Sequence, residues 1–215
     1  MKPWNHTYFD GNSPEVAYWA GFLMADGCLT QNGKGINSWR LSLSLHVKDG
    51  AHVLAFADAI ELDRSFAREE RGNKTEMLCV SVLHPDLPQS LLRWGVIPRK
   101  SWDFHAPDVP RHLLPHYLRG WADGDGYIAC RLKPNRVVRF AITGNPEAVV
   151  WYKNALCRLG FEGNAYIKPV RGRKCARLLI HARASVLAMP KLLKVRGNLH
   201  LARKWAEVLA VLADL

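Results

Sequence analysis

The sequence predicts an α+β protein built from two similar halves, each with the element order α-β-β-α-β-β-α. Three observations support this fold class. A twelve-residue segment occurs twice, at residues 18–29 and 117–128. Each copy is followed by the same succession of alternating, strand-like runs and amphipathic, helix-like runs. Each copy also contains an Asp-Gly pair, and the aspartates Asp26 and Asp125 lie 99 positions apart in a chain of 215 residues.

The first half begins with a helix whose start is well marked. Ser13 supplies a capping oxygen and Pro14 occupies the first helical position. We expect Gly27 to end this helix in the left-handed conformation. Residues 39–47 alternate between apolar and polar side chains, as a half-buried strand does. The other expected elements are a strand at 28–31, a helix at 51–62, strands at 65–70 and 76–83, and a helix at 88–94.

The second half repeats this order, starting with a helix that ends at Gly126. The expected elements after it are strands at 127–132 and 136–143, a helix at 146–159, two strands that flank 171–174, and closing helices. Residues 96–110 connect the halves and contain three prolines. We therefore divide the chain into an N-terminal half, 1–100, and a C-terminal half, 101–215, which pack directly and form a pseudo-symmetric monomer.

The charge balance favours a polyanionic partner. The chain has 30 Lys and Arg against 19 Asp and Glu, a formal net charge of +11 and a pI of about 9.7. Nucleic acid is favoured over an anionic membrane. Neither a long apolar segment nor an N-terminal apolar run occurs, so we expect no membrane and an intracellular site, either cytoplasm and nucleoid or an organelle matrix. Five scattered cysteines without a C-x-x-C pair disfavour a zinc finger and a disulfide framework.

The two aspartates have an unfavourable local position. Each carboxylate sits at the negative end of its helix dipole, which costs roughly 0.3–1 kcal/mol. A bound cation removes this cost, and the same placement occurs twice in an otherwise basic chain. A solvated surface acid is the alternative for either one alone. We therefore interpret Asp26 and Asp125 as metal ligands.

Both helices are rich in small residues, which predicts close packing between them. Glycine inside a helix costs about 1 kcal/mol against alanine, so its use needs a reason. Two helix backbones in close contact would provide one, and would bring both aspartates to a shared metal centre. The small residues are Ala17, Ala20, Gly21 and Ala25 in the first helix, and Gly120, Ala122 and Gly124 in the second.

Both repeats resemble the motif of the LAGLIDADG homing endonucleases, at residues 19–27 and 118–126. The first copy has Met24 where the motif has its first acid, whereas the second copy keeps both acids, Asp123 and Asp125. The later acid is the one that this family uses for metal binding, and both copies retain it. The resemblance covers nearly the whole chain.

The resemblance implies a fold and an activity. The motif helices pack at the centre, and two antiparallel sheets form a DNA-binding saddle that enters the major groove. A monomer of this family binds a long, asymmetric double-stranded DNA target and makes a double-strand break that leaves short 3′ overhangs, the reaction used in intron homing. The expected cofactor is Mg²⁺, with Mn²⁺ as a substitute and with Ca²⁺ binding without cleavage. The expected metal ligands are Asp26, Asp125, Ala25 and Gly124.

Three further residues are assigned catalytic roles by the resemblance. Lys100 matches the family's lysine ahead of the second motif. Lys204 is its counterpart, because Arg203-Lys204-Trp205 repeats the pattern around Lys100; a solvated lysine is the alternative. His46 ends a strand where relatives carry a water-positioning residue, with Thr143 as its counterpart; a generic strand-end histidine is the alternative.

The DNA-reading surface follows from strand alternation. If Leu41, Leu43 and Leu45 face the core, the residues between them face outward. Basic and small polar side chains on that face suit hydrogen bonding to phosphates and bases, although some of them could simply be solubilising charges. The residues expected to face DNA are Asn32, Lys34, Asn37, Arg40, Ser42, Ser44, Arg68, Arg71, Lys74, Arg131, Lys133, Arg136, Arg139, Lys168, Arg171, Arg173, Lys174 and Arg177.

The main alternative is a catalytically silent nucleic-acid binder with the same fold. It would be an intron RNA maturase, with intron RNA as a partner, or a DNA-binding regulator. Retention of both motif aspartates argues for the enzyme. A basic structural protein of another family would leave the paired Asp-Gly helix ends unexplained.

Overall fold

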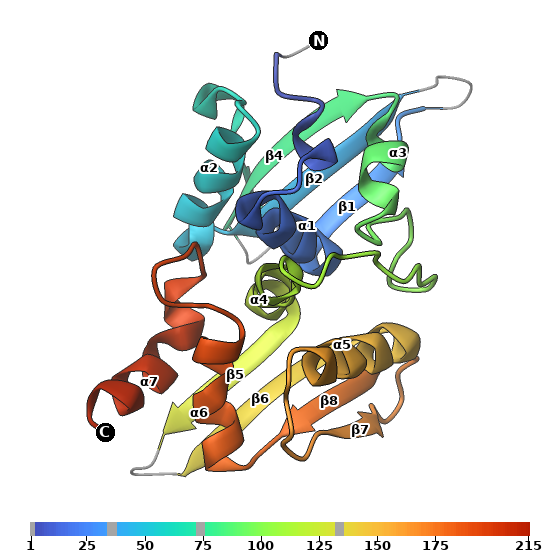
Figure 1. Cartoon of the computed structure of the whole chain (residues 1–215). Coiled ribbons are helices and arrows are strands. Elements are labelled where there is room, and N and C mark those ends of the chain that lie inside the picture. The colour runs from blue at the N-terminus through green and yellow to red at the C-terminus, as the bar shows by residue number, and fades with distance from the viewer. Residues whose placement is uncertain (1–2, 34–37, 72–75, 132–135) are drawn as a thin grey trace.

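The computed structural model describes residues 3–33, 38–71, 76–131 and 136–215. Within these ranges the chain forms two four-stranded antiparallel sheets with two helices between them (Figure 1). The strand orders are β1-β2-β4-β3 and β5-β6-β8-β7, which are the same pattern repeated. This arrangement confirms the predicted α+β class and its two pseudo-symmetric halves. None of the described helices has the length and apolar character that a membrane-spanning segment needs.

The first half contains three α-helices and one sheet. Its elements are α1 (Pro14–Asp26), β1 (Gly27–Gln31), β2 (Trp39–His46), α2 (Gly50–Ala59), β3 (Arg68–Arg71), β4 (Glu76–His84) and α3 (Leu87–Leu92). Short 3-10 turns occur at Tyr8–Asp10, Val47–Asp49 and Arg64–Phe66. The predicted start of α1 is confirmed, because the Ser13 side chain accepts a hydrogen bond from the Val16 N–H.

The second half repeats this series and adds a helix at its end. Its elements are α4 (Leu114–Asp125), β5 (Gly126–Arg131), β6 (Val137–Gly144), α5 (Pro146–Arg158), β7 (Tyr166–Pro169), β8 (Ala176–Ile180), α6 (Arg183–Leu192) and α7 (Ala202–Ala213). The helices pack on one face of each sheet and leave the other face open (Figure 1).

The two sheets also share one register. Gly27 of β1 lies opposite Leu43 of β2, and Gly126 of β5 lies opposite Ile142 of β6. Gly126 follows Gly27 by 99 positions and Ile142 follows Leu43 by 99 positions, the same separation as between the motif aspartates. The repeat seen in the sequence is therefore a repeat of strand pairing as well as of element order.

Side-chain alternation along β2 separates the core from the open face, as predicted. Leu41, Leu43 and Leu45 are buried against the helices, whereas Arg40 on the opposite face is exposed. Burial of each leucine side chain contributes about 1.5–3 kcal/mol. The apolar positions of β2 thereby determine which face of the sheet remains available to a partner.

Close packing of α1 and α4 forms the centre of the molecule. A Cβ added to Gly21 would lie 1.9 Å from the backbone oxygen of Tyr117, and one added to Gly120 would lie 1.9 Å from the backbone oxygen of Tyr18. The two contacts are reciprocal, as pseudo-symmetry requires. The prediction that glycines allow the helix backbones to touch is confirmed.

The expected role of the glycines after these helices was wrong. Gly27 and Gly126 have extended backbone conformations (φ −71° and −78°), because each helix passes directly into a strand without a left-handed turn. Glycine is required here for space. A Cβ at Gly27 would lie 2.7 Å from the Leu23 oxygen, and one at Gly126 would lie 2.2 Å from the Ala122 oxygen.

Two predicted boundaries in the first half also change. The strand expected from residue 65 begins at Arg68, because Asp63 accepts a hydrogen bond from the Ser65 N–H and holds a 3-10 turn there. The helix expected to reach residue 62 ends at Ala59, and Glu61 then turns the chain in a left-handed conformation (φ 56°).

An ion pair joins the two halves beside the central helices. The Arg203 guanidinium donates two hydrogen bonds, of 2.6 and 2.5 Å, to the carboxylate of Asp49. Asp49 is buried, whereas the side chain of Arg203 keeps 48% of its exposure. The pair fastens the first turn of α7 to the turn that precedes α2.

We expect Arg203→Ala to lower the free energy of unfolding by about 1–2 kcal/mol at pH 7, since it leaves a buried acceptor unpaired while solvent moderates the loss. The Arg203 hydrogen bond holds the pKa of Asp49 below its ordinary 3.8. The stabilisation is therefore present above pH 3.8 and is lost as the pH falls through the lower folded value. Urea unfolding of parent and variant across pH 3–7 tests this; Arg64→Ala, in an exposed pair with Asp58, should change little.

Candidate active site and nucleic-acid interface

The two motif aspartates meet at one end of the central helix pair. Asp26 is the last residue of α1 and Asp125 is the last residue of α4. A Cβ added to Gly124 would lie 2.2 Å from the Cβ of Ala25 and 3.1 Å from Oδ2 of Asp26. The close helix contact therefore continues to the last turn, and both carboxylates reach the same place between the sheets.

Their surroundings make both carboxylates harder to ionise. Both residues are exposed at their helix ends, but the protein atoms close to each carboxyl group displace part of its hydration and so act as partial burial. This burial raises the pKa of Asp125 to about 6, with the Asp26 charge as the next cause. Burial also raises the pKa of Asp26, and the ammonium groups of Lys204 and Lys100 oppose that shift. Two adjacent carboxylates whose ionised forms are both disfavoured are suited to sharing a cation.

Two lysines from distant parts of the chain approach the aspartates. Lys100 Nζ donates a hydrogen bond to the Gly27 oxygen, and Lys204 Nζ donates to the Gly124 oxygen. Burial lowers the pKa of both ammonium groups, and the charges of Asp26 and Asp125 oppose the shift. The structure therefore brings together the four residues that the sequence singled out from both halves.

The charge of each lysine acts on both aspartates. Among nearby charges, Lys204 acts most strongly on Asp26, whereas Lys100 acts more strongly than Lys204 on Asp125. A cavity of about 170 Å³ contains the second of these pairs, and Thr143 also lines it. Both lysines therefore lie close enough to the helix ends to act on both carboxylates.

Lys100 lies next to a strained backbone position. Arg99 has a left-handed conformation (φ 58°), which is unfavourable for a residue with a Cβ. The Arg99 oxygen accepts hydrogen bonds from the N–H groups of Trp102 and Asp103, at 2.8 and 3.1 Å. This turn holds the connector at the point where it delivers Lys100 to the helix ends.

The register changes the interpretation of His46. Its counterpart is Asn145 and not Thr143, because the 99-position offset of the paired strands matches Thr143 with Ser44. His46 Nδ1 accepts a hydrogen bond from the Lys48 N–H (3.1 Å), and Asn145 Oδ1 accepts one from the Glu147 N–H (2.9 Å). Both residues cap the turn or helix after their strand. Sequence alignment located the strand end but not its register.

Comparison with solved structures gives one consistent result. I-DmoI in complex with DNA and Mn is 16% identical, with a TM-score of 0.59 over 88% of this chain and 100% of its own. I-AabMI bound to uncleaved DNA is 15% identical, with a TM-score of 0.58 over 93% and 90%. The N-terminal LAGLIDADG domain of WhiA (DUF199) is 16% identical, with a TM-score of 0.56 over 95% and 92%. The chain has the LAGLIDADG fold.

This likeness is confined to structure. No protein-family model and no curated protein matches the sequence. The resemblance inferred from two short motifs is nevertheless confirmed at the level of the fold, since the similar chains are LAGLIDADG proteins and are matched over nearly their full length. The motif helices of the LAGLIDADG fold correspond here to α1 and α4, which carry the two aspartates.

The residues at the helix ends fit a divalent metal of the magnesium type. Mg²⁺ is commonly held by one or two carboxylates, with water and substrate phosphate completing its shell. Asp26 and Asp125 supply two carboxylates, and carbonyl groups in the last helical turn lack intrahelical donors. Gly124 already accepts a hydrogen bond from Lys204, but a carbonyl oxygen has a second lone pair. The described residues contain no larger cluster of His, Cys, Asp and Glu that could bind a metal.

Asp123 has a definite structural role that the motif alone did not predict. Its carboxylate is 1% exposed and accepts hydrogen bonds from three groups: the Tyr18 hydroxyl, the Leu201 N–H and Trp205 Nε1. In the first half Met24 takes the equivalent place and packs in the apolar core. The first acid of the motif is therefore a structural acceptor here, and the first half does without it.

The open face of the first sheet carries many of the predicted DNA contacts. Arg40, Ser42 and Ser44 lie on this face of β2, and Arg68 of β3 pairs with Cys79, which lies opposite Ser44. A groove of about 600 Å³ passes between the two arginines. Asn32 accepts a hydrogen bond from the Arg40 guanidinium (3.2 Å). Lys34, Asn37 and Lys74 lie outside the described residues, as does the side chain of Arg71.

The second sheet presents a more basic open face. Arg139 of β6 lies opposite Ala129, on the side that also carries Arg131, and Arg177 Nε donates to Thr143 Oγ1 (2.9 Å). Lys168 pairs with Arg177 across β7 and β8. The remaining predicted contacts of this half are Arg136, next to β6, and the exposed residues Arg171, Arg173 and Lys174 between β7 and β8; Lys133 lies outside the described residues.

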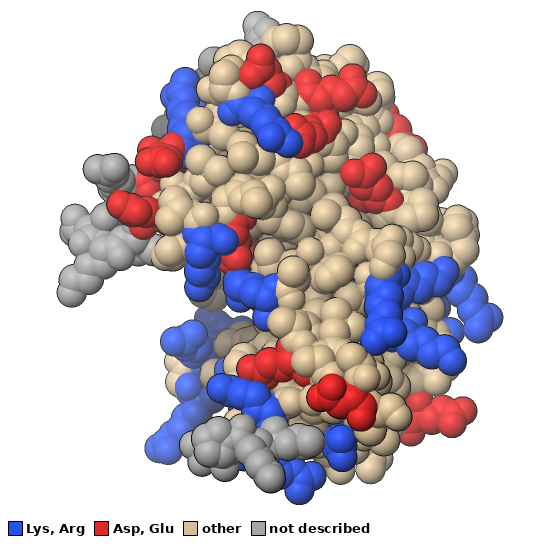
Figure 2. Space-filling view, turned by 90° about the vertical axis from the view of Figure 1, so that its left-hand side faces the viewer, with Lys and Arg blue, Asp and Glu red and all other residues tan. Residues whose placement is uncertain are grey.

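Two features of this face were not expected. Arg131 forms an ion pair with Glu207 of α7 (3.3 Å), which reduces its availability to phosphate. Trp102 of the connector is 65% exposed, and Lys174 Nζ lies 5.9 Å from its ring centre. Figure 2 shows Lys and Arg side chains gathered around the hollow between the two halves.

Proposed function

We propose that this protein is a homing endonuclease that binds a long, asymmetric double-stranded DNA target in its saddle and cuts both strands, leaving short 3′ overhangs. The observation that carries the proposal is the convergence of Asp26, Asp125, Lys100 and Lys204 at the ends of the central helices. A shared pair of carboxylates flanked by two ammonium groups is suited to binding a metal and a phosphodiester together.

Each residue has a distinct part in this reaction. Mg²⁺, when bound, supplies charge stabilisation for phosphodiester cleavage, and Mn²⁺ can take its place. Asp26 and Asp125 hold it, with the backbone oxygens of Ala25 and Gly124 as further ligands. Lys100 and Lys204 place positive charge beside the scissile phosphates. His46 remains a proposed polar contact at the edge of this site. I-DmoI has been solved with DNA together with Mn and with Ca, which supports divalent metals in this fold.

The two halves, 1–100 and 101–215, would each read one side of the target. Their open faces differ in residue type, since the first is rich in serine and the second in arginine. A chain with two different half-surfaces matches an asymmetric DNA site without a second copy. The nucleic acid in the similar solved complexes is DNA, so the proposal does not include intron RNA.

The decisive experiment presents the full chain with a library of duplex targets in Mg²⁺ and, separately, in Ca²⁺. We expect site-specific double-strand breaks in Mg²⁺, and binding of the same targets without cleavage in Ca²⁺. Tight binding with no cleavage in either metal would overturn the enzyme and identify a catalytically silent binder. Failure to bind any duplex would overturn both the enzyme and the silent DNA binder.

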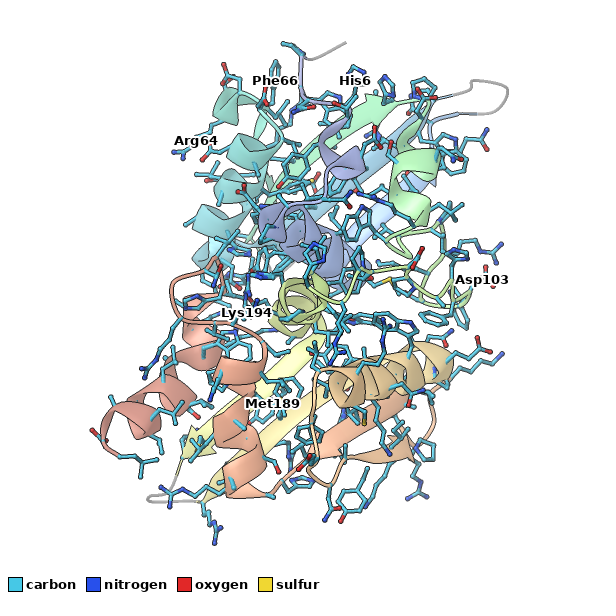
Figure 3. All side chains as sticks on the ribbon, viewed as in Figure 1. His6, Arg64, Phe66, Asp103, Met189 and Lys194 are labelled. Carbon is cyan, nitrogen blue, oxygen red and sulfur yellow. The ribbon has the colours of Figure 1, made fainter. Side chains whose placement is uncertain are left out.

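Removal of one open-face arginine should change the salt dependence of binding. Arg177→Ala is expected to reduce the slope of log affinity against log salt by about one, because one phosphate contact is lost. Fluorescence anisotropy with labelled target in Ca²⁺ measures the slope. Arg64→Ala is the matched control: Arg64 is paired with Asp58 beside α2 (Figure 3), and its removal should leave the slope unchanged.

A further inference from the structure

The carboxylate of Asp123 holds the start of α7 from inside the protein. Oδ2 accepts from the Leu201 N–H (2.7 Å), and Oδ1 accepts from Trp205 Nε1 (2.6 Å). Leu201 is the residue before α7, and Trp205 lies one turn into it. The two bonds therefore fix the first turn of α7 at its beginning and its end. Buried carboxylates with full sets of donors define geometry strongly, because no water can replace a lost partner.

Lys204 lies within this turn and holds α4 in return. Its Nζ donates to the Gly124 oxygen and lies 3.5 Å from the Ala122 oxygen, the two carbonyl groups on either side of Asp123. The two residues next to Asp123 thus bind Lys204, while Asp123 binds Leu201, which precedes Lys204, and Trp205, which follows it. We call these contacts the α4–α7 clamp.

Arg119 extends the clamp along the loop that leads to α7. Its buried guanidinium donates to the oxygens of Leu193 (2.8 Å), Lys194 (3.0 Å) and Leu199 (2.8 Å). Figure 3 shows Lys194 beside α4, where this loop passes the helix. The backbone of the loop between α6 and α7 is thereby bound to the motif helix α4.

Among the residues of the first half that the structure describes, there is no such clamp. The 99-position offset puts Met24 in the place of Asp123 and Ala20 in the place of Arg119, and both are buried apolar residues. Lys100 is delivered by the connector, after the left-handed turn at Arg99. The two active-site lysines are therefore held by different means, and only Lys204 depends on a buried carboxylate.

We propose that Asp123 is the positioning residue for Lys204: it fixes the first turn of α7 so that the Lys204 ammonium stays at the aspartate pair. The proposal rests on the proposed function and adds an asymmetry to it. Asp123 serves cleavage of the DNA strand whose scissile phosphate lies beside Lys204, and cleavage at the phosphate beside Lys100 is independent of it.

The first test measures the two strands separately. The substrate is a DNA target that the parent cleaves, with a different label on each DNA strand. It is incubated with the parent, Asp123→Asn, Lys204→Met and the double variant. We expect Asp123→Asn to slow one strand about ten- to a hundredfold, as loss of a positioning contact does, and to spare the other strand. The same strand should be slowed by Lys204→Met, and the losses should not multiply in the double variant.

Tyr18→Phe is the matched control. It removes the α1 donor of Asp123 but leaves the Leu201 and Trp205 bonds, so both strands should keep their relative rates. Trp205→Phe removes one clamp bond without changing Asp123, and it should reproduce the one-strand effect if Asp123→Asn does not fold. Equal slowing of both strands, or slowing of the strand that Lys204→Met spares, would overturn the proposal.

A second test is independent of cleavage. Acetylation of the metal-free protein by an amine-reactive reagent, quantified by mass spectrometry, should become faster at Lys204 in Asp123→Asn and stay unchanged at Lys100. Unchanged reactivity of Lys204 would overturn the clamp even in an active enzyme. If the parent cuts no target, the proposed function fails while this measurement still decides the positioning role.

Discussion

Asp26→Asn and Asp125→Asn are each expected to abolish double-strand cleavage, with a loss of about a thousandfold or more, because metal-ion stabilisation contributes several kcal/mol to such reactions. Asparagine keeps the shape of the side chain but removes the negative charge that a divalent cation needs. Cleavage of a bound target in Mg²⁺, followed on a gel under single-turnover conditions, measures the loss. A variant that cuts at the parental rate would remove that aspartate from the mechanism.

The same substitutions should stabilise the metal-free protein. The pKa of Asp125 is raised to about 6 from 3.8, so the native state holds its proton more tightly than the unfolded chain does. Stability therefore decreases as the pH rises from about 4 to about 6, and the ionised carboxylate remains a cost at pH 7. Asp125→Asn removes this cost, and thermal unfolding at pH 7 without metal should show a higher Tm than the parent.

The combination of lost cleavage and gained stability separates a metal site from a structural one. Target binding in Ca²⁺, if Ca²⁺ bridges the aspartates and DNA, should weaken in the variants, whereas metal-free binding should not. Asp103→Asn is the control, because Asp103 is an exposed acid of the connector away from the helix ends (Figure 3). Its replacement should leave Tm, binding and cleavage unchanged. A lower Tm in Asp125→Asn would indicate that the carboxylate has a stabilising partner instead.

The sequence was sufficient to predict the fold and the meeting of the two motif aspartates, because both depend on features that repeat. Gly21 and Gly120 are costly in a helix unless backbones touch, and Asp26 and Asp125 are costly at a helix end unless a cation is bound. Such costs are visible without a structure. Alternation along β2 was equally informative, since strand period and burial together leave only one face for the core.

The remaining parts depend on contacts between distant residues of dissimilar halves. Asp49 meets Arg203 and Asp123 meets Leu201 across separations of 154 and 78 positions, with no equivalent contact in the other half to signal them. Ser44 and Thr143 could be matched as equivalent positions of the two halves only from the strand register, which an alignment of motifs does not contain. Lys204 was identified only from the short sequence pattern that it shares with Lys100, because its position in space depends on the loop that Arg119 holds.

Gly120→Ala is expected to cost about 3 kcal/mol of unfolding free energy, at the upper end for overpacking. Alanine is intrinsically about 1 kcal/mol better than glycine inside a helix, so the change would stabilise an isolated α4. In the protein its Cβ would lie 1.9 Å from the Tyr18 oxygen and 2.8 Å from the Phe22 nitrogen, both of which are backbone atoms that no rotamer change can move. The helices must separate, which in a chain of this length lowers Tm by roughly 6–12 °C.

Gly50→Ala is the matched control, since its Cβ would lie 3.3 Å from Cδ2 of Leu78, the flexible end of that side chain, and 3.9 Å from its Cβ, an ordinary contact. Thermal unfolding should therefore show a small change. Gly21→Ala should behave like Gly120→Ala, and the double variant should lose less than the sum, because helices already separated have room for the second methyl group. Separation of α1 and α4 also moves Asp26 away from Asp125. Cleavage should therefore fall in Gly120→Ala even at temperatures where the variant remains folded. Full activity in a folded Gly120→Ala protein would show that contact between the helix backbones is not what holds the two carboxylates together.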